Sequence, residues 1–365
     1  MRIATMVRAY LPVPRPPDIP YAPLDVAVDV ALGLQRRGHD VDFYAPLGSV
    51  LDVPVKTLGM RSLVTTVDEW VAWLADIKPH LHYVAWLRDF AMARDMFECA
   101  SRGVYDVLLF HHPEVALPFV ERYPRVRVVS VLHDPLFPWY ADMFAAHRSP
   151  ASHLVSISDR QRNGRDDLPF AATIHHGVDV DTYAFGVAEA DAPLLFAGRI
   201  TPEKGAAEAV RLALAAGREL VLCGGYFPAQ EKYFEDTVRP FLGSQIRYAG
   251  YQERENLVSY DQQASALLAP IDCEESFGLT MIEAMACGTP VLTLDRGSVP
   301  EVVKHRETGF IASDLRELER SITGIADISR RRCREHVVGN FTTDHMITRY
   351  ENLFTDLVYG GHTRA

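Results

Sequence analysis

Short runs of apolar residues alternate with amphipathic segments along most of this chain. The run Ile3–Val7 precedes a segment of helical periodicity, Val26–Arg37, and a second run, Val41–Tyr44, follows it. Two further strand-sized runs cover Val104–Phe110 and Val126–Leu132. Strands that alternate with helices form parallel sheets, because each right-handed crossover places its helix on a face of the sheet. The expected fold class is therefore α/β, with doubly wound parallel sheets.

The second half of the chain repeats this alternation. Its strand-sized runs are Leu194–Ala197, Leu220–Cys223, Ile246–Ala249, Ala266–Pro270 and Pro290–Leu294. A chain of 365 residues is too long for one ordinary core and suits two domains of ~150 to 200 residues each. The polar stretch Asp179–Asp191 marks the junction. We expect one Rossmann-like domain over residues 1–180 and another over residues 181–340.

Two glutamates, Glu275 and Glu283, stand just before and inside a predicted helix. Apolar residues at helical spacing, Ser276 as a cap and Gly288 as a stop predict a helix over residues 277–287. The backbone N–H groups at its start suit an anion such as a diphosphate. The residues expected around this anion are Ser276, Phe277, Gly278, Leu279 and Thr280. The two carboxylates can then hold hydroxyl groups on opposite sides of the diphosphate.

A glycine-containing loop, Gly198–Gly205, follows the strand expected at Leu194–Ala197. Its glycines permit a close approach of the backbone to a ligand. Arg199 and Lys204 in this loop can neutralise phosphate oxygens, the arginine as a fork and the lysine as a point charge. The loop therefore predicts a second part of the same phosphate site.

In these two segments the chain resembles the retaining glycosyltransferases of family 4, in glycosyl transferase group 1, which have the GT-B fold. Gly198–Gly205 is similar to the family's G-R-x-x-x-x-K-G segment, and Glu275–Glu283 is similar to its E-x7-E segment. Further family-like pieces are Arg37–Val41, His133-Asp134, Ile174–Asp179, Gly297–Glu301 and Gly309-Phe310. The resemblance implies two Rossmann-like domains facing each other across a cleft, the first on the acceptor side. It also implies that residues 341–365 form a helix that crosses back to the first domain.

The resemblance also implies roles for the motif residues. Arg199 and Lys204 would hold the donor diphosphate, and Glu283 would hold the ribose. Glu275 would hold the transferred sugar, with His133 beside that sugar and the acceptor. The donor-binding set is Arg199, Lys204, Glu275, Ser276, Phe277, Gly278, Leu279, Thr280 and Glu283, and the catalytic set is His133, Glu275, Arg199 and Lys204.

The first half contributes candidates for the acceptor side. Ligands of open parallel sheets bind beyond the carboxyl ends of the strands, where three histidines stand. The acceptor-side candidates are Asp25, His111, His112 and Asp134. The structural alternatives are that the histidines only end strands and that Asp25 only compensates a helix dipole. The aromatic stretch Asp68–Cys99 favours helix packing over acceptor binding.

The loop after the first strand departs from the family pattern. The family has a Gly-Gly pair where this chain has Tyr21–Asp25. Pro23 in that stretch has no backbone N–H, which removes one donor to a phosphate.

Composition excludes several other classes of protein. A net charge of −11 disfavours nucleic acid and anionic membranes as general partners. Five cysteines without a C-x-x-C pair disfavour structural zinc and disulfides, and indicate a cytoplasmic protein. No apolar run is long enough to predict a transmembrane segment, and the first residues do not resemble a secretory signal. Peripheral membrane contact and the choice between monomer and homodimer stay open.

Together with the resemblance, these features predict a metal-independent hexosyltransferase, and the resemblance implies that the anomeric configuration is retained. It would move a hexose-type sugar from a UDP-, GDP- or dTDP-sugar to a hydroxyl group of a small-molecule or glycan acceptor. No Asp-x-Asp motif follows a strand, so we expect no metal ligands and no further cofactor. Two alternatives are a sugar-nucleotide epimerase of the same fold and a non-catalytic nucleotide-sugar-binding protein. A nicotinamide-dependent dehydrogenase is disfavoured, because no Gly-x-Gly-x-x-Gly follows the first strand.

Overall fold

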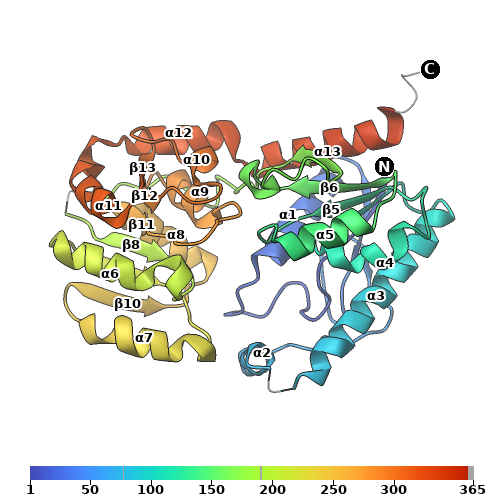
Figure 1. The fold of residues 1–365 in the computed structure, drawn as a ribbon, viewed down its shortest axis with the longest axis horizontal. Helices are drawn as coiled ribbons and strands as arrows, with labels where there is room; N and C mark the ends of the chain where they lie inside the picture. Colours follow the sequence, from blue (N-terminus) through green and yellow to red (C-terminus); the bar gives the residue numbers. More distant parts are fainter. Residues whose placement is uncertain (77, 190, 361–365) are drawn as a thin grey trace. The chain divides into compact units, whose positions relative to one another are not determined.

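The computed structural model describes residues 1–76, 78–189 and 191–360, and these form two compact units (Figure 1). Unit 1 comprises Met1–His175 and the described part of Thr343–Ala365, and unit 2 comprises His176–Thr342. Each unit contains one sheet in which all strand pairs are parallel. The prediction of doubly wound parallel sheets is therefore confirmed. The predicted junction and the predicted last segment include residues 190 and 361–365, which lie outside the described residues.

The sheet of unit 1 has the strand order β3-β2-β1-β4-β5-β6-β7. Its strands are β1 Arg2–Met6, β2 Asp40–Tyr44, β3 Val55–Lys56, β4 Val107–Phe110, β5 Val128–Val131, β6 Ser152–Ser156 and β7 Phe170–Thr173. The order changes direction between β1 and β4, the place where open parallel sheets bind ligands. Met6 lies opposite Phe110, and Phe110 lies opposite Ser130. The carboxyl ends of these three strands therefore share one edge of the sheet.

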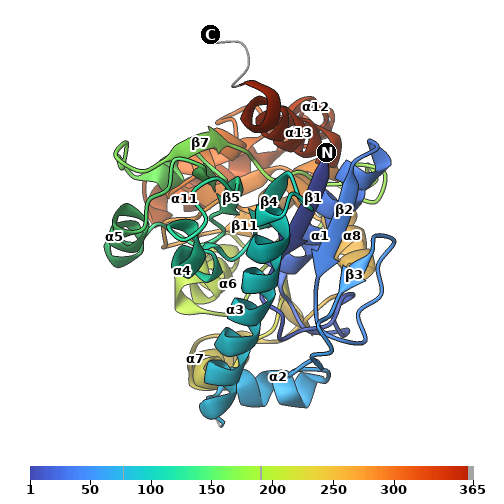
Figure 2. The ribbon, with the colours of Figure 1, turned by 90° about the vertical axis from the view of Figure 1, so that its right-hand side faces the viewer.

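Helices cover both faces of this sheet. They are α1 Ala22–Arg36, α2 Val67–Leu74, α3 His80–Ser101, α4 Leu117–Val120, α5 Pro138–Ala146 and α13 Thr343–Tyr359. The long helix α3 lies against β4 (Figure 2), where the rings of Phe97 and Phe110 stack with 5.9 Å between their centroids. The aromatic stretch is therefore helical, as expected, and its apolar face forms part of the core. Trp70 on α2 is also buried.

Helix α13 packs against α1 within unit 1. An added Cβ at Gly33 would lie 2.6 Å from Cγ1 of Ile347, so the absence of a side chain at residue 33 allows this close approach. Nη1 of Arg37 donates to Glu351 at 2.9 Å, and Nε2 of His39 also contacts Glu351 at 2.9 Å. Packing and charge pairing together hold the last described helix on the first one.

The sheet of unit 2 has the strand order β10-β9-β8-β11-β12-β13. Its strands are β8 Leu194–Ala197, β9 Leu220–Cys223, β10 Ile246–Gly250, β11 Ala266–Ala269, β12 Val291–Leu294 and β13 Gly309–Ala312. Its helices are α6 Ala206–Ala215, α7 Glu231–Thr237, α8 Arg254–Gln263, α9 Leu279–Ala286, α10 Val299–Val302, α11 Leu315–Ser321 and α12 Arg330–Asn340. Leu194, Leu222 and Leu268, from three adjacent strands, are fully buried in one core cluster. The switch point of this sheet lies between β8 and β11.

The sequence prediction differs from the structure at several element ends. Strand β4 begins at Val107, three residues after the predicted start, and the carboxylate of Asp106 accepts a hydrogen bond from the backbone N–H of Arg2 at 2.8 Å. Helix α1 begins at Ala22, since Pro23 suits the first helical turn. The sequence analysis did not identify β3, β6, β7 or β13.

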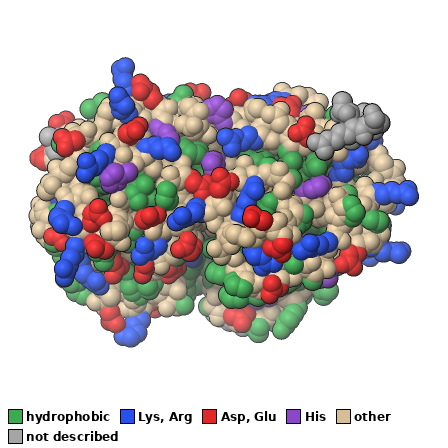
Figure 3. Space-filling view, turned by 45° about the horizontal axis from the view of Figure 1, so that its top comes forward, with side chains coloured by type: hydrophobic (Ala, Val, Ile, Leu, Met, Phe, Trp, Pro, Cys, Tyr) green, Lys and Arg blue, Asp and Glu red, His purple; other side chains and the backbone are tan. Residues whose placement is uncertain are grey.

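The described surface carries both acidic and basic side chains. On the face shown in Figure 3, acidic and basic side chains are interspersed over the described residues instead of forming one large patch. No helix in the described part of the chain is both long and apolar enough to cross a membrane.

Candidate active site

The loop after β8 carries the predicted phosphate-binding residues in unit 2. A short 3-10 turn, Pro202–Lys204, ends at Gly205, whose φ is +77°. An added Cβ at Gly205 would lie 2.1 Å from the carbonyl oxygen of Pro270. Only glycine fits both the conformation and the contact. The loop is therefore pressed against the segment that follows β11, where Glu275 stands.

Lys204 and Glu275 meet across these two loops. Nζ of Lys204 lies 2.5 Å from Oε2 of Glu275, and their side chains are 24% and 14% exposed. Both residues were predicted from separate motifs, and the fold brings them together although 71 positions separate them. A charged pair this short and partly buried forms a charge-assisted hydrogen bond. The ammonium group has three N–H donors, so it can hold Glu275 and a further anion together.

Arg199 stands at the start of the same loop with a more open environment. Its guanidinium is 51% exposed and lies 3.8 Å from the carboxylate of Glu203. An exposed pair at that distance contributes little to stability. The guanidinium can therefore turn to a phosphate without losing a strong contact.

The residues just before α10 contact the loop that carries Glu275 and fix its backbone. An added Cβ at Gly297, whose φ is +51°, would lie 2.2 Å from the carbonyl oxygen of Glu275. The backbone N–H of Ser298 donates to the same carbonyl oxygen at 2.9 Å. Oγ of Ser298 donates to the carbonyl oxygen of Phe277 at 2.9 Å. These contacts fix the backbone on which the Glu275 carboxylate stands.

The predicted start of the helix after Glu275 was wrong. Helix α9 begins at Leu279, and its N-cap is Gly278, with φ 90° and ψ 59°, without a side-chain cap. Ser276 lies too far before the first turn, because a capping side chain must reach the N–H groups two or three residues ahead. Leu279 and Thr280 therefore lie in the first turn, whereas Ser276 and Phe277 precede it. Phe277 is buried, so it supports this loop from inside.

Glu283 lies in the middle of α9 and has a partner that the sequence analysis missed. The hydroxyl of Tyr183 donates to Oε1 of Glu283 at 2.6 Å. Burial, followed by the negative charge of Glu283, raises the pKa of Tyr183, so its hydroxyl stays protonated and keeps donating. Asp261 is also buried nearby, and burial together with Glu283 raises its pKa well above the usual value. No spacing signal could reveal Tyr183, because it lies in the predicted junction, 100 positions from Glu283.

In unit 1, two of the predicted histidines form a pair beyond the strand ends. Nδ1 of His111 lies 3.1 Å from Nε2 of His133, so one imidazole donates to the other. His111 follows β4 directly and His133 lies two residues beyond β5. Burial lowers the pKa of His133 to about 4. His133 is therefore a neutral imidazole at pH 7, able to share hydrogen bonds but not to serve as an acid.

His112 belongs to a second, mostly buried polar cluster. Its Nε2 lies 3.3 Å from Nη1 of Arg8 and 3.4 Å from Oε2 of Glu114. Arg8 in turn donates to Asp89 at 2.5 Å, and Asp89 is fully buried on α3. The sequence analysis did not select Arg8, Asp89 or Glu114. The sequence could have indicated Arg8 as a site residue, because it comes two residues after the end of β1 and therefore at the ligand-binding edge.

The remaining acceptor-side candidates lie at the same edge. Asp25, in the first turn of α1, pairs with Arg15 at 3.2 Å. Asp134 is exposed, and its carbonyl oxygen accepts a hydrogen bond from the amide of Gln161 at 2.8 Å.

The two sets of side chains suit different ligands. The unit 2 set is cationic at the β8 loop and suits phosphate groups, with carboxylates that accept hydrogen bonds from hydroxyl groups. The unit 1 set offers imidazoles and carboxyls to a neutral polar group. In the described residues, no three or more His, Cys, Asp or Glu side chains are grouped to hold a metal ion.

Comparison with known proteins identifies a related family. Residues 184–336 match the family model of glycosyl transferases group 1. A D-inositol 3-phosphate glycosyltransferase of Jonesia denitrificans is 30% identical over 192 residues, which cover 47% of this chain and 45% of that protein. The chain therefore spans less than half the length of that relative.

Solved structures resemble the whole described chain. Sucrose-phosphate synthase from Thermosynechococcus elongatus has a TM-score of 0.76 at 19% identity, with coverage of 99% of this chain and 100% of that chain. HepE of Anabaena, solved in complex with UDP and glucose, has a TM-score of 0.70 at 15% identity, with coverage of 98% and 100%.

The two doubly wound units and these structural neighbours define the two-domain GT-B fold of glycosyltransferases. Residues 184–336 match the family model of glycosyl transferases group 1, the family that the sequence motifs indicated.

Proposed function

We propose that the chain is a retaining, metal-independent glycosyltransferase. It transfers a hexose-type sugar from a UDP-, GDP- or dTDP-sugar to a hydroxyl group of a small acceptor or glycan. The observation that carries this proposal is the 2.5 Å pair of Lys204 and Glu275 inside the segment that matches group 1 glycosyl transferases. A nucleotide-sugar donor needs a cation beside its phosphate and a group that accepts hydrogen bonds from its sugar hydroxyls. This pair joins both groups.

Each part of the donor has a partner under this proposal. Arg199 and Lys204 bind the diphosphate, with the N–H groups of Leu279 and Thr280 at the first turn of α9. Glu275 accepts hydrogen bonds from sugar hydroxyl groups while it holds Lys204. Glu283, oriented by Tyr183, binds the ribose. The complex of HepE with UDP and glucose supports a uridine nucleotide as the first donor to test.

The proposed chemical step depends on the charge that develops on the donor as its bond to the sugar breaks. As the bond between C1 and the phosphate oxygen breaks, negative charge grows on the leaving diphosphate, and Arg199 and Lys204 stabilise it. The acceptor hydroxyl attacks C1 from the face that the diphosphate leaves, so the anomeric configuration is retained. Its proton passes to the departing phosphate oxygen. His133 hydrogen-bonds as a neutral imidazole, because its pKa of about 4 removes the charge at pH 7.

A panel of nucleotide sugars tests the proposal. The protein is incubated with UDP-, GDP- and dTDP-hexoses, and free nucleotide, sugar identity and melting temperature are measured. Slow release of nucleoside diphosphate, with a raised melting temperature, supports a transferase, since bound ligand stabilises the fold. Interconversion of the sugar without release would indicate an epimerase. Binding with neither reaction, even with acceptors present, would indicate a binding protein.

A further inference from the structure

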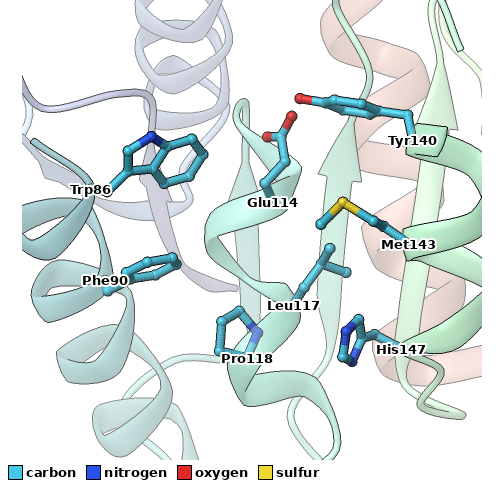
Figure 4. Close-up of a pocket in the computed structure, with 8 residues that line it drawn as sticks. All are labelled: Trp86, Phe90, Glu114, Leu117, Pro118, Tyr140, Met143 and His147. Carbon is cyan, nitrogen blue, oxygen red and sulfur yellow. The ribbon is translucent and has the colours of Figure 1, made fainter. Parts of the chain in front are cut away.

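Unit 1 contains an apolar cavity of about 520 Å³ that the donor-binding groups do not use (Figure 4). Trp86 and Phe90 from α3 form one wall, and Tyr140 and Met143 from α5 form the opposite wall. Leu117 lies between them. Small-molecule sites typically measure ~300 to 1,000 Å³ and have mostly apolar walls with a few polar groups. The cavity therefore has the size and lining of a ligand site.

Its wall contains one buried carboxyl group. Glu114 is 9% exposed, and among the described residues its Oε2 has no hydrogen-bond partner. The Nε2 of His112 lies 3.4 Å from that oxygen. Burial, with a smaller effect of Asp134, raises the pKa of Glu114 to about 7, whereas burial keeps His112 neutral by lowering its pKa. Glu114 and His112 therefore do not form a strong ion pair at pH 7. A buried oxygen without a hydrogen bond is costly, so a ligand hydroxyl there would be favoured.

The cavity adjoins the ligand-binding edge of the sheet. The guanidinium carbon of Arg8 lies 4.1 Å from the centroid of the Trp86 ring, and the ring of His112 lies 5.4 Å from it. Arg8 and His112 follow β1 and β4, beside the switch point. Trp86 and Glu114 therefore contact both the cavity and the polar residues at that edge.

Apolar side chains continue outward along the two helices. Tyr83 and Leu87 are 72% and 68% exposed; Tyr83 lies three residues before Trp86 and shares its face of α3, and Leu87 follows one turn after Tyr83. Trp139 is 63% exposed, one turn before Met143 on α5. Exposed apolar side chains beside an apolar cavity indicate a binding surface.

We propose that this cavity holds the acceptor, and that the acceptor is a neutral small molecule with an aromatic or alicyclic body. A hydroxyl group of that molecule hydrogen-bonds to Glu114. This inference rests on the proposed transferase function.

The lining decides the charge of the occupant. None of the described side chains that line the cavity belongs to Lys or Arg. The lining imidazole of His147 lies 3.5 Å from Glu121, and the guanidinium of Arg8, behind the Trp86 ring, is already paired with Asp89. The lining therefore favours a neutral group over a phosphate or sulfate. The guanidinium of Arg8 already lies over the Trp86 ring, which disfavours a second cation on that ring. A neutral body fits both conditions. The relative from Jonesia denitrificans is named for an anionic acceptor, so the cavity predicts a different acceptor class here.

Three naphthalene probes test the site by equilibrium binding, followed by fluorescence. They are 2-naphthol, naphthalene, which lacks the hydroxyl, and 2-naphthyl phosphate, which is anionic. We expect 2-naphthol to bind best, by roughly fivefold over naphthalene, as for one neutral hydrogen bond. Glu114→Leu should abolish that preference while naphthalene still binds. Met143→Arg should weaken both probes by roughly tenfold or more, because it places a charge in the apolar wall.

A matched control separates the cavity from general surface effects. Val50→Arg changes another exposed apolar residue of unit 1, 73% exposed against 44% for Met143, and should leave probe binding unchanged. Equal binding of all probes to Met143→Arg and wild type would overturn the inference. So would preferred binding of 2-naphthyl phosphate. Sedimentation with phosphatidylglycerol vesicles without 2-naphthol binding would overturn it in favour of a membrane surface.

Donor measurements on the same samples keep the two proposals distinguishable. Met143→Arg should still bind nucleotide sugars and should keep the slow background release of nucleotide. It should no longer transfer glucose to 2-naphthol. If wild type releases nucleotide but never glucosylates a bound naphthol, the acceptor role is wrong while the transferase proposal stands. If no nucleotide sugar binds, the proposed function fails, and the acceptor assignment fails with it.

Discussion

The hydroxyl of Tyr183 donates a hydrogen bond to Glu283 at 2.6 Å, which joins the segment before β8 to the middle of α9. The carboxylate is thereby held in one orientation before any ligand binds. In the proposed donor complex, Glu283 accepts a hydrogen bond from a ribose hydroxyl while Tyr183 holds its orientation. Preorganisation of this kind reduces the entropy lost on binding.

Tyr183→Phe should weaken UDP binding by roughly fivefold, because Glu283 loses the group that orients it. Titration calorimetry with UDP measures the change. The control is Tyr44→Phe, which removes a similar hydroxyl–carboxylate hydrogen bond, 2.8 Å to Asp95, in unit 1. Equal losses of UDP affinity in both variants would show a general destabilisation instead of a local effect.

Alanine variants of the two glutamates should separate the sugar side of the donor from the ribose side. Glu283→Ala should weaken the nucleotide sugar and free nucleoside diphosphate alike, since both carry the ribose. Glu275→Ala should leave nucleoside diphosphate affinity nearly intact while it lowers transfer. Hydrogen bonds to charged groups are worth roughly 1.5 to 3 kcal/mol, so the two affinities should differ about tenfold or more in calorimetry. Equal losses in both variants would reverse the proposed orientation of the donor.

Excess EDTA should leave sugar transfer unchanged, because Arg199, Lys204 and the start of α9 neutralise the leaving diphosphate in this account. Initial rates of nucleotide release are compared with and without the chelator. Loss of activity that magnesium or manganese restores would show that a cation performs this role.

Acidification should destabilise unit 1 through His133. Its folded pKa of about 4 lies below the unfolded value of 6.5, so the unfolded chain binds more protons between these two values. The contribution of His133 to the free energy of unfolding is therefore fully present above pH 6.5, and it decreases as the pH falls toward 4. Since His133 is partly exposed, its contribution between pH 7 and pH 5 is at most about 2 kcal/mol.

Urea unfolding at pH 7 and pH 5 measures this difference in wild type and His133→Asn. The chain contains four tryptophans, and all of them lie in unit 1, so their fluorescence follows that unit. The variant should lose less stability than wild type between the two pH values. The same loss in both proteins would show that His133 is not the titrating group.

Local patterns of the sequence predicted the elements of the fold that have strong periodicity. Strands β8 and β9 match their predicted ranges, because each is a short apolar run between a proline or polar residue and a glycine. Strands β3 and β7 were missed, since β3 has only two residues and β7 is only partly buried. The start of α9 was misplaced because serine is a common cap, whereas Gly278 in a left-handed conformation holds that position.

The candidate site shows the same limit. Lys204 and Glu275 could each be predicted, because both stand in recognisable loops next to strands and helices. Their 2.5 Å contact could not, since it depends on how the β8 and β11 loops pack around Gly205. Tyr183 and Asp89 act through partners 100 and 81 positions away, which no local pattern encodes.

The most direct test of the account is the rate of nucleotide release from a nucleotide sugar by Lys204→Ala. Lys232→Ala is the control, because that side chain is 87% exposed on α7 and pairs only with Asp236 among the contacts of the described residues. We expect kcat/KM to fall roughly tenfold to hundredfold in Lys204→Ala, as for one charge-assisted contact, and to stay unchanged in Lys232→Ala. Wild-type kinetics in Lys204→Ala, at both limiting and saturating donor, would contradict the proposed phosphate site and with it the donor complex.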